Sequence, residues 1–215
     1  MREPWSRGYV KVCGVTSVEN SLEVVAAGVD AIGVNLATSP RRVTPDQARA
    51  ILDATRGSVL RCGVFADNED EEISACANAL DFDILQIHGP LGPALHDDLR
   101  RRGVRIVKAL NIESEEFSNF DDGLVDAVLV DGPRPGSGAE HSWDGLGTRV
   151  FRVPIIAAGG LTPQNVGKVI FATRAWGVDC ASGVESQLGV KDSRLVQEFV
   201  TSARTAWPEE EESWR

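Results

Sequence analysis

Long hydrophobic runs are missing from this sequence of 215 residues, and so are closely spaced metal ligands. No apolar run approaches the ~20 residues that a membrane-spanning helix needs, and residues 1–8 are too polar for a signal peptide. The four cysteines lie far apart without a C-x-x-C spacing, and no histidine stands at ligand spacing. These absences predict a cytoplasmic protein with no membrane partner, no disulfide framework and no zinc or other metal site.

Positive charge is scarce relative to negative charge. Lys and Arg together number 22 and Asp and Glu 32, so the formal net charge is −10 with neutral histidines. A negative field of this size repels phosphate backbones and anionic lipid headgroups, which argues against nucleic acid or a membrane surface as partner. If the ligand is itself an anion, a local site has to hold it against the field of the whole molecule.

One pattern repeats through the chain: a short apolar run, a polar turn, an amphipathic stretch, a glycine and the next apolar run. The apolar runs are rich in valine and isoleucine without strict alternation, which is typical of parallel strands covered on both faces. They are residues 9–13, 30–35, 59–65, 83–88, 104–110, 125–131, 154–157 and 176–180. Eight such strands alternating with helices predict an α/β fold, the (β/α)8 TIM barrel. The alternative, an open doubly wound sheet, has less support because no G-x-G-x-x-G follows the first strand.

Local signals mark the ends of several predicted helices. Thr44 and Gln47 form a capping box in front of an apolar stripe, and Asn68 is the expected cap of the next helix. Thr162 and Pro163 open a later helix. Glycines between a helix and the following strand suit the left-handed backbone of a helix end, at Gly28, Gly57 and Gly103.

A single domain accounts for nearly the whole chain, because no linker and no second pattern interrupts the repeat. We expect the barrel domain to span residues 1–207. Residues 208–215 include four consecutive glutamates and are expected to form a solvated or disordered acidic tail.

Two reactive side chains end predicted strands, where the functional groups of a TIM barrel lie. Cys13 ends the first strand and Asp131 the sixth, so both can reach the same mouth. A thiol and a carboxyl group across one pocket suit proton transfers on a sugar, one at carbon and one at oxygen. A free thiol pKa of ~8.5 is near enough to neutrality that modest local help would give the thiolate. The alternatives are a small core cysteine and the first residue of an Asp-Gly-Pro turn.

Other strand ends carry groups suited to anions. Arg41 follows the second strand, and its planar fork would suit a carboxylate, unless it is a plain surface arginine. His88 ends the fourth strand, either as a substrate contact or as a hydrogen-bonded strand-end residue. The last two strands end in small residues whose backbone N–H groups can approach a phosphate, namely Gly159, Gly160, Ser182 and Gly183.

A series of segments resembles the phosphoribosylanthranilate isomerase family of tryptophan biosynthesis, in the family's order, from about residue 9 to residue 206. Single segments are common to many barrels, whereas the full series is specific. The cysteine of the first strand separates this family from related histidine-pathway isomerases, which have an aspartate there. The segments are Lys11-Val12-Cys13-Gly14-Val15-Thr16, Ser39-Pro40-Arg41, Gly63-Val64-Phe65, Gln86-Ile87-His88-Gly89, Val130-Asp131-Gly132, Ala158-Gly159-Gly160-Leu161-Thr162-Pro163-Gln164-Asn165-Val166, Ser182-Gly183-Val184-Glu185 and Lys191-Asp192.

The resemblance implies an isomerase that performs an Amadori rearrangement without cofactor or metal. N-(5-phosphoribosyl)anthranilate would become 1-(2-carboxyphenylamino)-1-deoxyribulose 5-phosphate. Asp131 would be the general acid that opens the furanose ring, and Cys13 the general base that removes the C2 proton. Arg41 would hold the anthranilate carboxylate, while the two glycine-containing loops would bind the phosphate. The expected partner is this small phosphorylated substrate, and the protein is expected to be a monomer or a homodimer.

The chain also departs from the family's pattern at several loop positions. None of these departures removes a proposed catalytic group, but they concern the loops around the anthranilate. Two alternatives therefore stay open: a specialised-metabolism relative that rearranges a modified aryl amine, and a non-catalytic phosphosugar-binding barrel. The departures are Asn35-Leu36-Ala37-Thr38, the sequence Gly136-Ser137-Gly138 leading to His141-Ser142-Trp143, Ala181 and Leu188.

Overall fold

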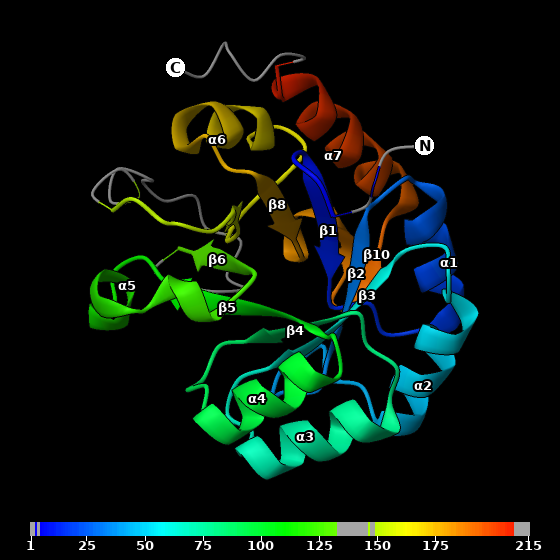
Figure 1. Ribbon diagram of the computed structural model, residues 1–215. Coiled ribbons are helices and arrows are strands. Elements are labelled where there is room, and N and C mark those ends of the chain that lie inside the picture. The colour runs from blue at the N-terminus through cyan, green and yellow to red at the C-terminus, as the bar shows by residue number, and fades with distance from the viewer. Residues whose placement is uncertain (1–2, 4, 133–145, 147–148, 209–215) are drawn as a thin grey trace.

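The computed structural model describes residues 3, 5–132, 146 and 149–208. At its centre lies a closed barrel of eight parallel strands in chain order, with β8 pairing with β1 (Figure 1). Each strand begins and ends within two residues of its predicted range, so the TIM-barrel prediction is confirmed and the open sheet is excluded. The strands are β1 (Tyr9–Cys13), β2 (Ala31–Asn35), β3 (Leu60–Phe65), β4 (Ile84–Ile87), β5 (Arg105–Asn111), β6 (Ala127–Asp131), β7 (Ile155–Ala157) and β8 (Gly177–Cys180).

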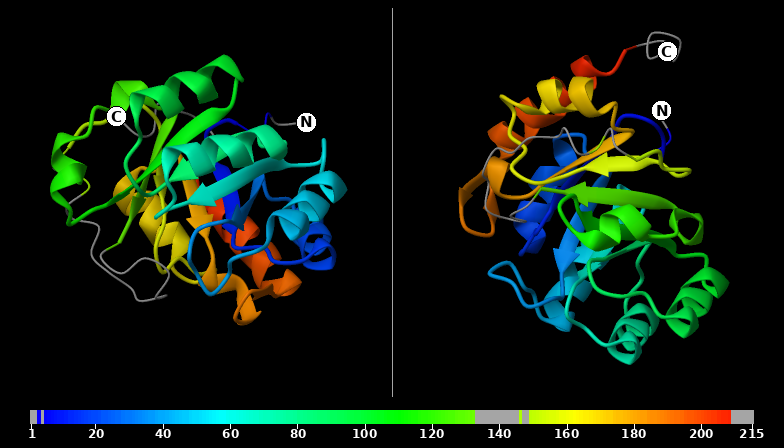
Figure 2. Two further views of the ribbon diagram at one scale, coloured as in Figure 1. Left: turned by 90° about the horizontal axis from the view of Figure 1, so that it is seen from below. Right: turned by 90° about the vertical axis from the view of Figure 1, so that its left-hand side faces the viewer.

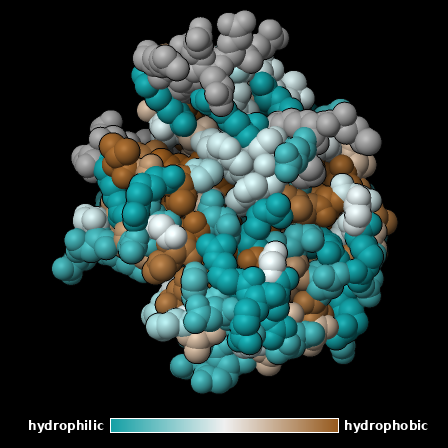
Figure 3. Space-filling view, viewed as in Figure 1, coloured by the Kyte–Doolittle hydropathy of each residue, from teal (hydrophilic) through white to brown (hydrophobic). Residues whose placement is uncertain are grey.

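Helices cover the outside of the barrel (Figure 2). They are α1 (Val18–Ala26), α2 (Pro45–Ala54), α3 (Asp70–Ala79), α4 (Pro93–Arg101), α5 (Glu115–Asn119), α6 (Val166–Thr173) and α7 (Ser193–Ala206), with short 3₁₀ turns η1 (Asp122–Leu124) and η3 (Ser182–Val184). The surface over α3 and α4 is mainly hydrophilic (Figure 3). Within the described ranges, no helix has the length and apolarity needed to cross a membrane.

Alternation of side chains along the strands decides which residues enter the barrel. In β1, Val10 and Val12 pack toward the helices, whereas Tyr9 belongs to the apolar cluster inside the barrel. Lys11 and Cys13 follow Tyr9 at intervals of two residues, so they also face the interior. The barrel interior is therefore apolar at the amino ends of the strands and becomes polar toward their carboxyl ends.

The predicted helix signals are correct in part. Thr44 and Gln47 form the capping box of α2, and Gly28, Gly57 and Gly103 have positive φ. Asn68 is not a helix cap: Glu69 occupies the N-cap position of α3 without a capping hydrogen bond from its side chain, and the Asn68 side chain accepts a hydrogen bond from the backbone of Ala66. Helix α6 begins at Val166, and residues 163–165 form a turn that leads directly into it. Thr162 and Asn165 exchange side-chain-to-backbone hydrogen bonds across this turn, and the carbonyl oxygen of Thr162 accepts from the backbone N–H of Val166 at 3.0 Å.

A hairpin that the sequence did not indicate follows the last barrel strand. It consists of β9 (Glu185–Gln187) and β10 (Val190–Lys191), paired antiparallel. The side chain of Asn20 in α1 bonds both backbone groups of Lys191, each at 2.8 Å, and Thr16 donates to the carbonyl oxygen of Gly189 at 2.7 Å. The hairpin is thus fixed against the loop and helix that follow β1.

The predicted boundary of the barrel domain at residue 207 stays a prediction. The last helix, α7, ends at Ala206 and the described chain reaches Pro208. The remainder of the predicted acidic tail, 209–215, lies outside the described residues.

Candidate active site

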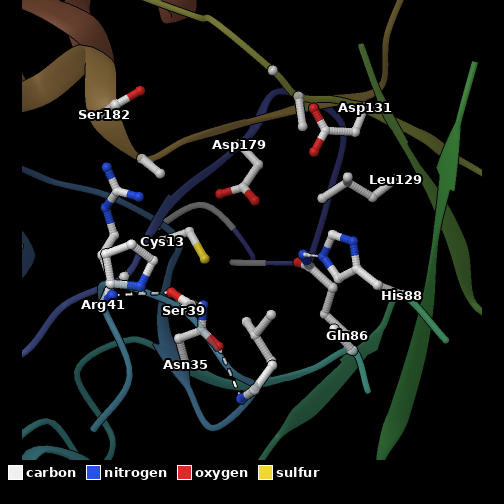
Figure 4. Close-up of a pocket in the computed structure, with 18 of the residues that line it drawn as sticks. Cys13, Asn35, Ser39, Arg41, Gln86, His88, Leu129, Asp131, Asp179 and Ser182 are labelled. Atoms are coloured by element: carbon white, nitrogen blue, oxygen red, sulfur yellow. Dashed lines mark hydrogen bonds between the residues drawn. The ribbon is translucent and has the colours of Figure 1, made fainter. Parts of the chain in front are cut away.

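A pocket of about 480 Å³ lies at the carboxyl ends of the strands (Figure 4). Its lining comes from the ends of the strands and the loops after them, as expected for a TIM barrel. The lining residues are Cys13, Gly14, Asn35, Ala37, Thr38, Ser39, Pro40, Arg41, Val64, Ala66, Gln86, His88, Leu129, Asp131, Ala158, Gly159, Gly160, Leu161, Asp179, Ala181 and Ser182. Seven of the eight predicted site residues are therefore brought together in one cavity; the eighth, Gly183, is not part of the lining.

Asp131 ends β6 and faces the cavity from the side opposite Cys13 (Figure 4). Burial, with a smaller effect of the nearby Asp179 carboxylate, raises the pKa of Asp131 to about 7, although a backbone hydrogen bond from Gly132 and the charge of Lys11 act against this. Its Oδ1 atom is buried and has no hydrogen-bond partner among the described residues. A carboxyl group in this environment can hold a proton near neutral pH and donate it to a ligand.

Cys13 ends β1, and its environment raises the pKa of the thiol. Burial is the largest cause; the charge of Lys11 opposes it and the charge of Asp179 adds to it. The local help that the sequence analysis called for is therefore insufficient in this pocket, because desolvation outweighs the charge of Lys11. Gly33 on the neighbouring strand lies directly against the thiol: a Cβ there would stand 2.9 Å from Sγ.

Three polar residues inside the barrel were missed by the sequence reasoning. The ammonium of Lys11 donates to Asp179 Oδ2 at 2.7 Å and to Gln86 Oε1 at 2.9 Å. Although burial acts against it, the Asp179 carboxylate holds the pKa of Lys11 above its usual value. Lys11 precedes Cys13 by two residues, so strand alternation was the signal that could have placed it in the interior.

His88 faces the pocket in one defined tautomer. Lys11 can only donate, so Gln86 uses its oxygen toward Lys11 and its amide nitrogen toward His88 Nε2, 3.0 Å away. Burial and the charges of Lys11 and Lys108 lower the pKa of His88 to about 4. The imidazole is therefore neutral at pH 7, with Nε2 as acceptor and Nδ1 carrying the proton.

Arg41 lies in the pocket, and its guanidinium is already paired with a carboxylate. Nε and Nη2 donate to the two oxygens of Glu185 at 2.7 and 2.8 Å. The aliphatic part of Arg41 crosses Gly14, where a Cβ would stand 2.5 Å from Cδ. Arg42, in contrast, is exposed. The pairing partner Glu185 was quoted in the resemblance but not predicted as a site residue.

The two loops predicted to bind phosphate lie side by side. Gly159 and Gly160 have φ of 90° and 66° and line the pocket, and the Asn165 side chain donates to the carbonyl oxygen of Gly160 at 2.9 Å. Ser182 lines the pocket at the start of η3. Gly183 serves the packing of the loops, because a Cβ there would stand 1.9 Å from the carbonyl oxygen of Leu161.

Part of the predicted site cannot be placed. The segment after β6 that carries Gly136, Ser137, Gly138, His141 and Trp143 lies outside the described residues. Of the other departures, Asn35, Ala37, Thr38 and Ala181 line the pocket. In the part of the chain that the structure describes, no group of three or more His, Cys, Asp or Glu side chains could hold a metal ion.

Fold and site together define a (β/α)8-barrel protein with one pocket at the carboxyl ends of its strands. In this pocket a thiol lies across from a carboxyl group with a pKa near 7, beside two glycine-containing loops. Residues 10–202 match the family described as N-(5′-phosphoribosyl)anthranilate (PRA) isomerase. The chain belongs to this family, as the resemblance indicated.

Individual relatives agree with this assignment. The chain is 38% identical over 205 residues to the N-(5′-phosphoribosyl)anthranilate isomerase of Rubrobacter xylanophilus, covering 91% of this chain and 98% of the relative. The crystal structure of phosphoribosyl anthranilate isomerase from Thermus thermophilus superposes with a TM-score of 0.79 at 33% identity, covering 93% of this chain and 100% of that one. A phosphoribosyl anthranilate isomerase in complex with reduced 1-(o-carboxyphenylamino)-1-deoxyribulose 5-phosphate superposes with a TM-score of 0.76 at 29% identity, covering 92% and 98%.

Proposed function

We propose that this protein converts N-(5′-phosphoribosyl)anthranilate into 1-(2-carboxyphenylamino)-1-deoxyribulose 5-phosphate in the cytoplasm, as a step of tryptophan biosynthesis. Family membership supports the reaction. The observation that carries the mechanism is the pairing of Asp131, with its pKa near 7, and Cys13 in one pocket. General acid–base chemistry on a sugar needs one proton donor and one proton acceptor on either side of the reacting carbons.

Asp131 acts first, as the general acid. Its carboxyl group gives a proton to the furanose ring oxygen while the bond between that oxygen and C1 breaks. The lone pair of the anthranilate nitrogen forms a double bond to C1, which leaves an iminium cation and a free hydroxyl. The pKa near 7 suits this step, because a carboxyl group with an ordinary pKa would hold almost no proton at neutral pH.

Cys13 acts second, as the general base. Its thiolate removes the proton from C2, and the electron pair of that bond forms the C1–C2 double bond while the nitrogen becomes neutral. The resulting enolamine gains a proton at C1 and loses one from the C2 hydroxyl, which yields the ketone. Every electron pair stays within the substrate, so the rearrangement balances as an isomerisation. The cation of Lys11 stabilises the thiolate when it forms.

The two anionic groups of the substrate are assigned to different partners within the pocket. Arg41 would bind the anthranilate carboxylate with the N–H groups that Glu185 does not accept. The backbone of Gly159 and Gly160 and the start of η3 at Ser182 would bind the phosphate. His88 would offer its Nδ1 hydrogen to the substrate as a neutral donor.

Turnover of freshly formed N-(5′-phosphoribosyl)anthranilate, followed by its fluorescence decay, tests the proposal. Wild-type protein should consume the substrate far above the uncatalysed breakdown, and Asp131→Asn should reduce the rate to near background. Cys13→Ser should lower kcat by roughly 10²-fold, the scale of losing a general base. Cys76→Ser changes a thiol on α3, outside the pocket, and should behave as wild type.

Different results would redirect the proposal. A near-normal kcat in Cys13→Ser would remove the thiol from the mechanism. An inert wild-type protein that still binds the reduced product would move the search to a different aryl amine.

A further inference from the structure

The guanidinium of Arg41 is held along one edge only. A guanidinium has five N–H donors, and Glu185 accepts one from Nε and one from Nη2, side-on, at 2.7 and 2.8 Å. Both side chains are largely buried, with 12% exposure for Arg41 and 7% for Glu185. A ligand carboxylate in the pocket therefore has to use the other end of the guanidinium, formed by Nη1 and the second hydrogen of Nη2. The ion pair decides which edge of Arg41 is presented.

Glu185 is itself fixed from three directions. Besides Arg41, its Oε1 atom accepts from the buried ammonium of Lys191 at 2.7 Å and from the backbone N–H of Gly189 at 3.2 Å. Burial acts against ionisation, but the hydrogen bonds from Arg41 and Lys191 outweigh it and lower the pKa of Glu185. The carboxylate is thus charged at neutral pH, and a charged, multiply bonded carboxylate is a rigid anchor for an arginine.

The side chains of Arg41, Glu185 and Lys191 are also connected to the loop that carries Ser182, one of the two loops proposed to bind phosphate. Lys191 also donates to the carbonyl oxygen of Ala181 at 2.9 Å, directly before Ser182. Arg41, Glu185 and Lys191 together carry two positive charges and one negative charge. The cluster keeps a net charge of +1 beside the pocket of a protein whose formal charge is −10. One surplus positive charge matches one carboxylate.

We propose that Glu185 is a positioning residue that fixes Arg41 for end-on binding of a ligand carboxylate and thereby sets the preference of the pocket for a carboxylated aryl amine. The inference rests on the proposed function of the pocket, and it assigns to the β9–β10 hairpin a role in specificity. Without Glu185, the arginine keeps its charge but loses its orientation, so a ligand must order a flexible side chain on binding.

Two ligands used as probes distinguish a loss of Arg41 orientation from general damage to the pocket. The first is reduced 1-(o-carboxyphenylamino)-1-deoxyribulose 5-phosphate, and the second is the same compound with a phenylamino group, which lacks only the carboxylate. Wild-type protein should bind the first more tightly, as measured by calorimetric titration. Glu185→Ala should weaken the first probe by about tenfold or more and leave the second within twofold, because only the first uses Arg41.

A double-mutant cycle completes the test. Arg41→Ala should remove the preference for the carboxylated probe, and adding Glu185→Ala to it should change nothing further. In turnover, Glu185→Ala should raise KM with kcat within threefold of wild type, since the carboxylate contact is present in both ground and transition states. Glu185→Gln keeps the size but turns an amide NH₂ toward Arg41 or Lys191, and it should lose the preference as well. Gln187→Ala, on the exposed side of the same hairpin, is the matched control and should retain it.

Three results would overturn the inference. If Glu185→Ala and Glu185→Gln weaken both probes equally, Glu185 only supports the fold of the loop. If they tighten the carboxylated probe, Glu185 competes with the ligand rather than positioning its receptor. If wild-type protein turns over substrate and prefers the carboxylated probe while the variants keep that preference, the inference fails and the proposed function survives. Wild-type protein that binds neither probe and lacks turnover contradicts both.

Discussion

Cys13 and Asp131 face one cavity, and burial raises the pKa of both side chains. The pKa of Asp131 is about 7, whereas burial raises the pKa of the Cys13 thiol above the ordinary thiol range, so the acid has the lower pKa of the two. The active form needs a protonated acid and a deprotonated base. Because the acid has the lower pKa of the two, this form is a minority of the free enzyme at every pH. The active form is therefore sparsely populated, but the thiolate that it contains is a base of high proton affinity.

The pH dependence of kcat/KM follows from this order. Below pH 7, Asp131 is protonated and the thiolate fraction rises with pH, so the rate should rise. Between about 7 and the thiol pKa, loss of the acid and gain of the base cancel, which should give a plateau extending beyond pH 9. Above the thiol pKa the rate should fall. Steady-state kinetics from pH 5 to 10.5 measure the profile, and a maximum confined to pH 5–6 would contradict the two pKa values.

Asp131 should also lower the free energy of unfolding once its carboxyl group is ionised. Its folded pKa of about 7 exceeds the ordinary value of 3.8, so between these values the native state binds more protons than the unfolded state. Stability contributed by the protonated carboxyl is present below pH 4 and is lost as pH rises through 7. Asp131→Asn should therefore raise the free energy of unfolding at pH 8, by at most about 4 kcal/mol at ~1.4 kcal/mol per pKa unit, and change it little at pH 3.5. Urea unfolding at both pH values measures this; equal effects at the two would refute it.

At the scale of elements, strand β2 makes room for the thiol of strand β1. Gly33 is the register partner of Cys13, and a Cβ at Gly33 would stand 2.9 Å from Sγ and 3.2 Å from Lys11 Cε. Gly33→Ala should displace the thiol and lower kcat by roughly tenfold or more, since small displacements of a reacting group are costly. Turnover and the alkylation rate of Cys13 with iodoacetamide measure the effect.

Gly167→Ala is the matched control for Gly33→Ala. Gly167 lies within helix α6, and its added Cβ would meet Ala206 Cβ at 3.6 Å, an ordinary contact. This change should leave kcat unaltered and stabilise the protein by roughly 0.5–1 kcal/mol, because alanine is the better helix former. A wild-type kcat in both variants would show that a Cβ at position 33 can be accommodated without displacing the thiol, and would contradict the prediction.

At the scale of the whole molecule, the last helix connects the C-terminal part of the chain to the first two strands of the barrel. Arg204 of α7 donates to the carbonyl oxygens of Gly8 and Gly28, at 3.3 and 3.0 Å, and to the Asp30 carboxylate at 3.1 Å. Asp30 in turn accepts from the backbone N–H of Val10 at 2.8 Å. These residues precede or begin β1 and β2, at the end of the barrel opposite the pocket. Arg204 thus holds the first two strands from the end of the barrel opposite the pocket.

Arg204→Met should therefore lower stability and spare activity. We expect a loss of about 1–3 kcal/mol, less than for a fully buried pair because Arg204 is one-third exposed. The kcat/KM value should stay at the wild-type level. Arg194→Met removes an exposed charge from the first turn of the same helix and should change the free energy of unfolding by less than about 0.5 kcal/mol. Equal losses in the two variants would show that the contacts of Arg204 contribute nothing particular.

The sequence by itself determined the barrel and most of the cavity. The valine- and isoleucine-rich runs and the glycines after helices are local signals, so strands β1 to β8 were predicted to within two residues. Cys13, Asp131, Arg41 and His88 end strands or follow them, and the closed barrel necessarily turns such residues toward one mouth. The family resemblance required only the order of the segments along the chain.

Tertiary structure alone decided the electrostatics of the site. Lys11 and Asp179 are 168 positions apart in sequence, and Arg41 and Glu185 are 144 apart, so no local pattern announces either ion pair. Desolvation depends on what surrounds a group in three dimensions, which is why the raised pKa of the Cys13 thiol ran against the expectation. The sequence could place the acid and the base at one mouth, but only the packing of strands from both ends of the chain set which of them holds its proton more tightly.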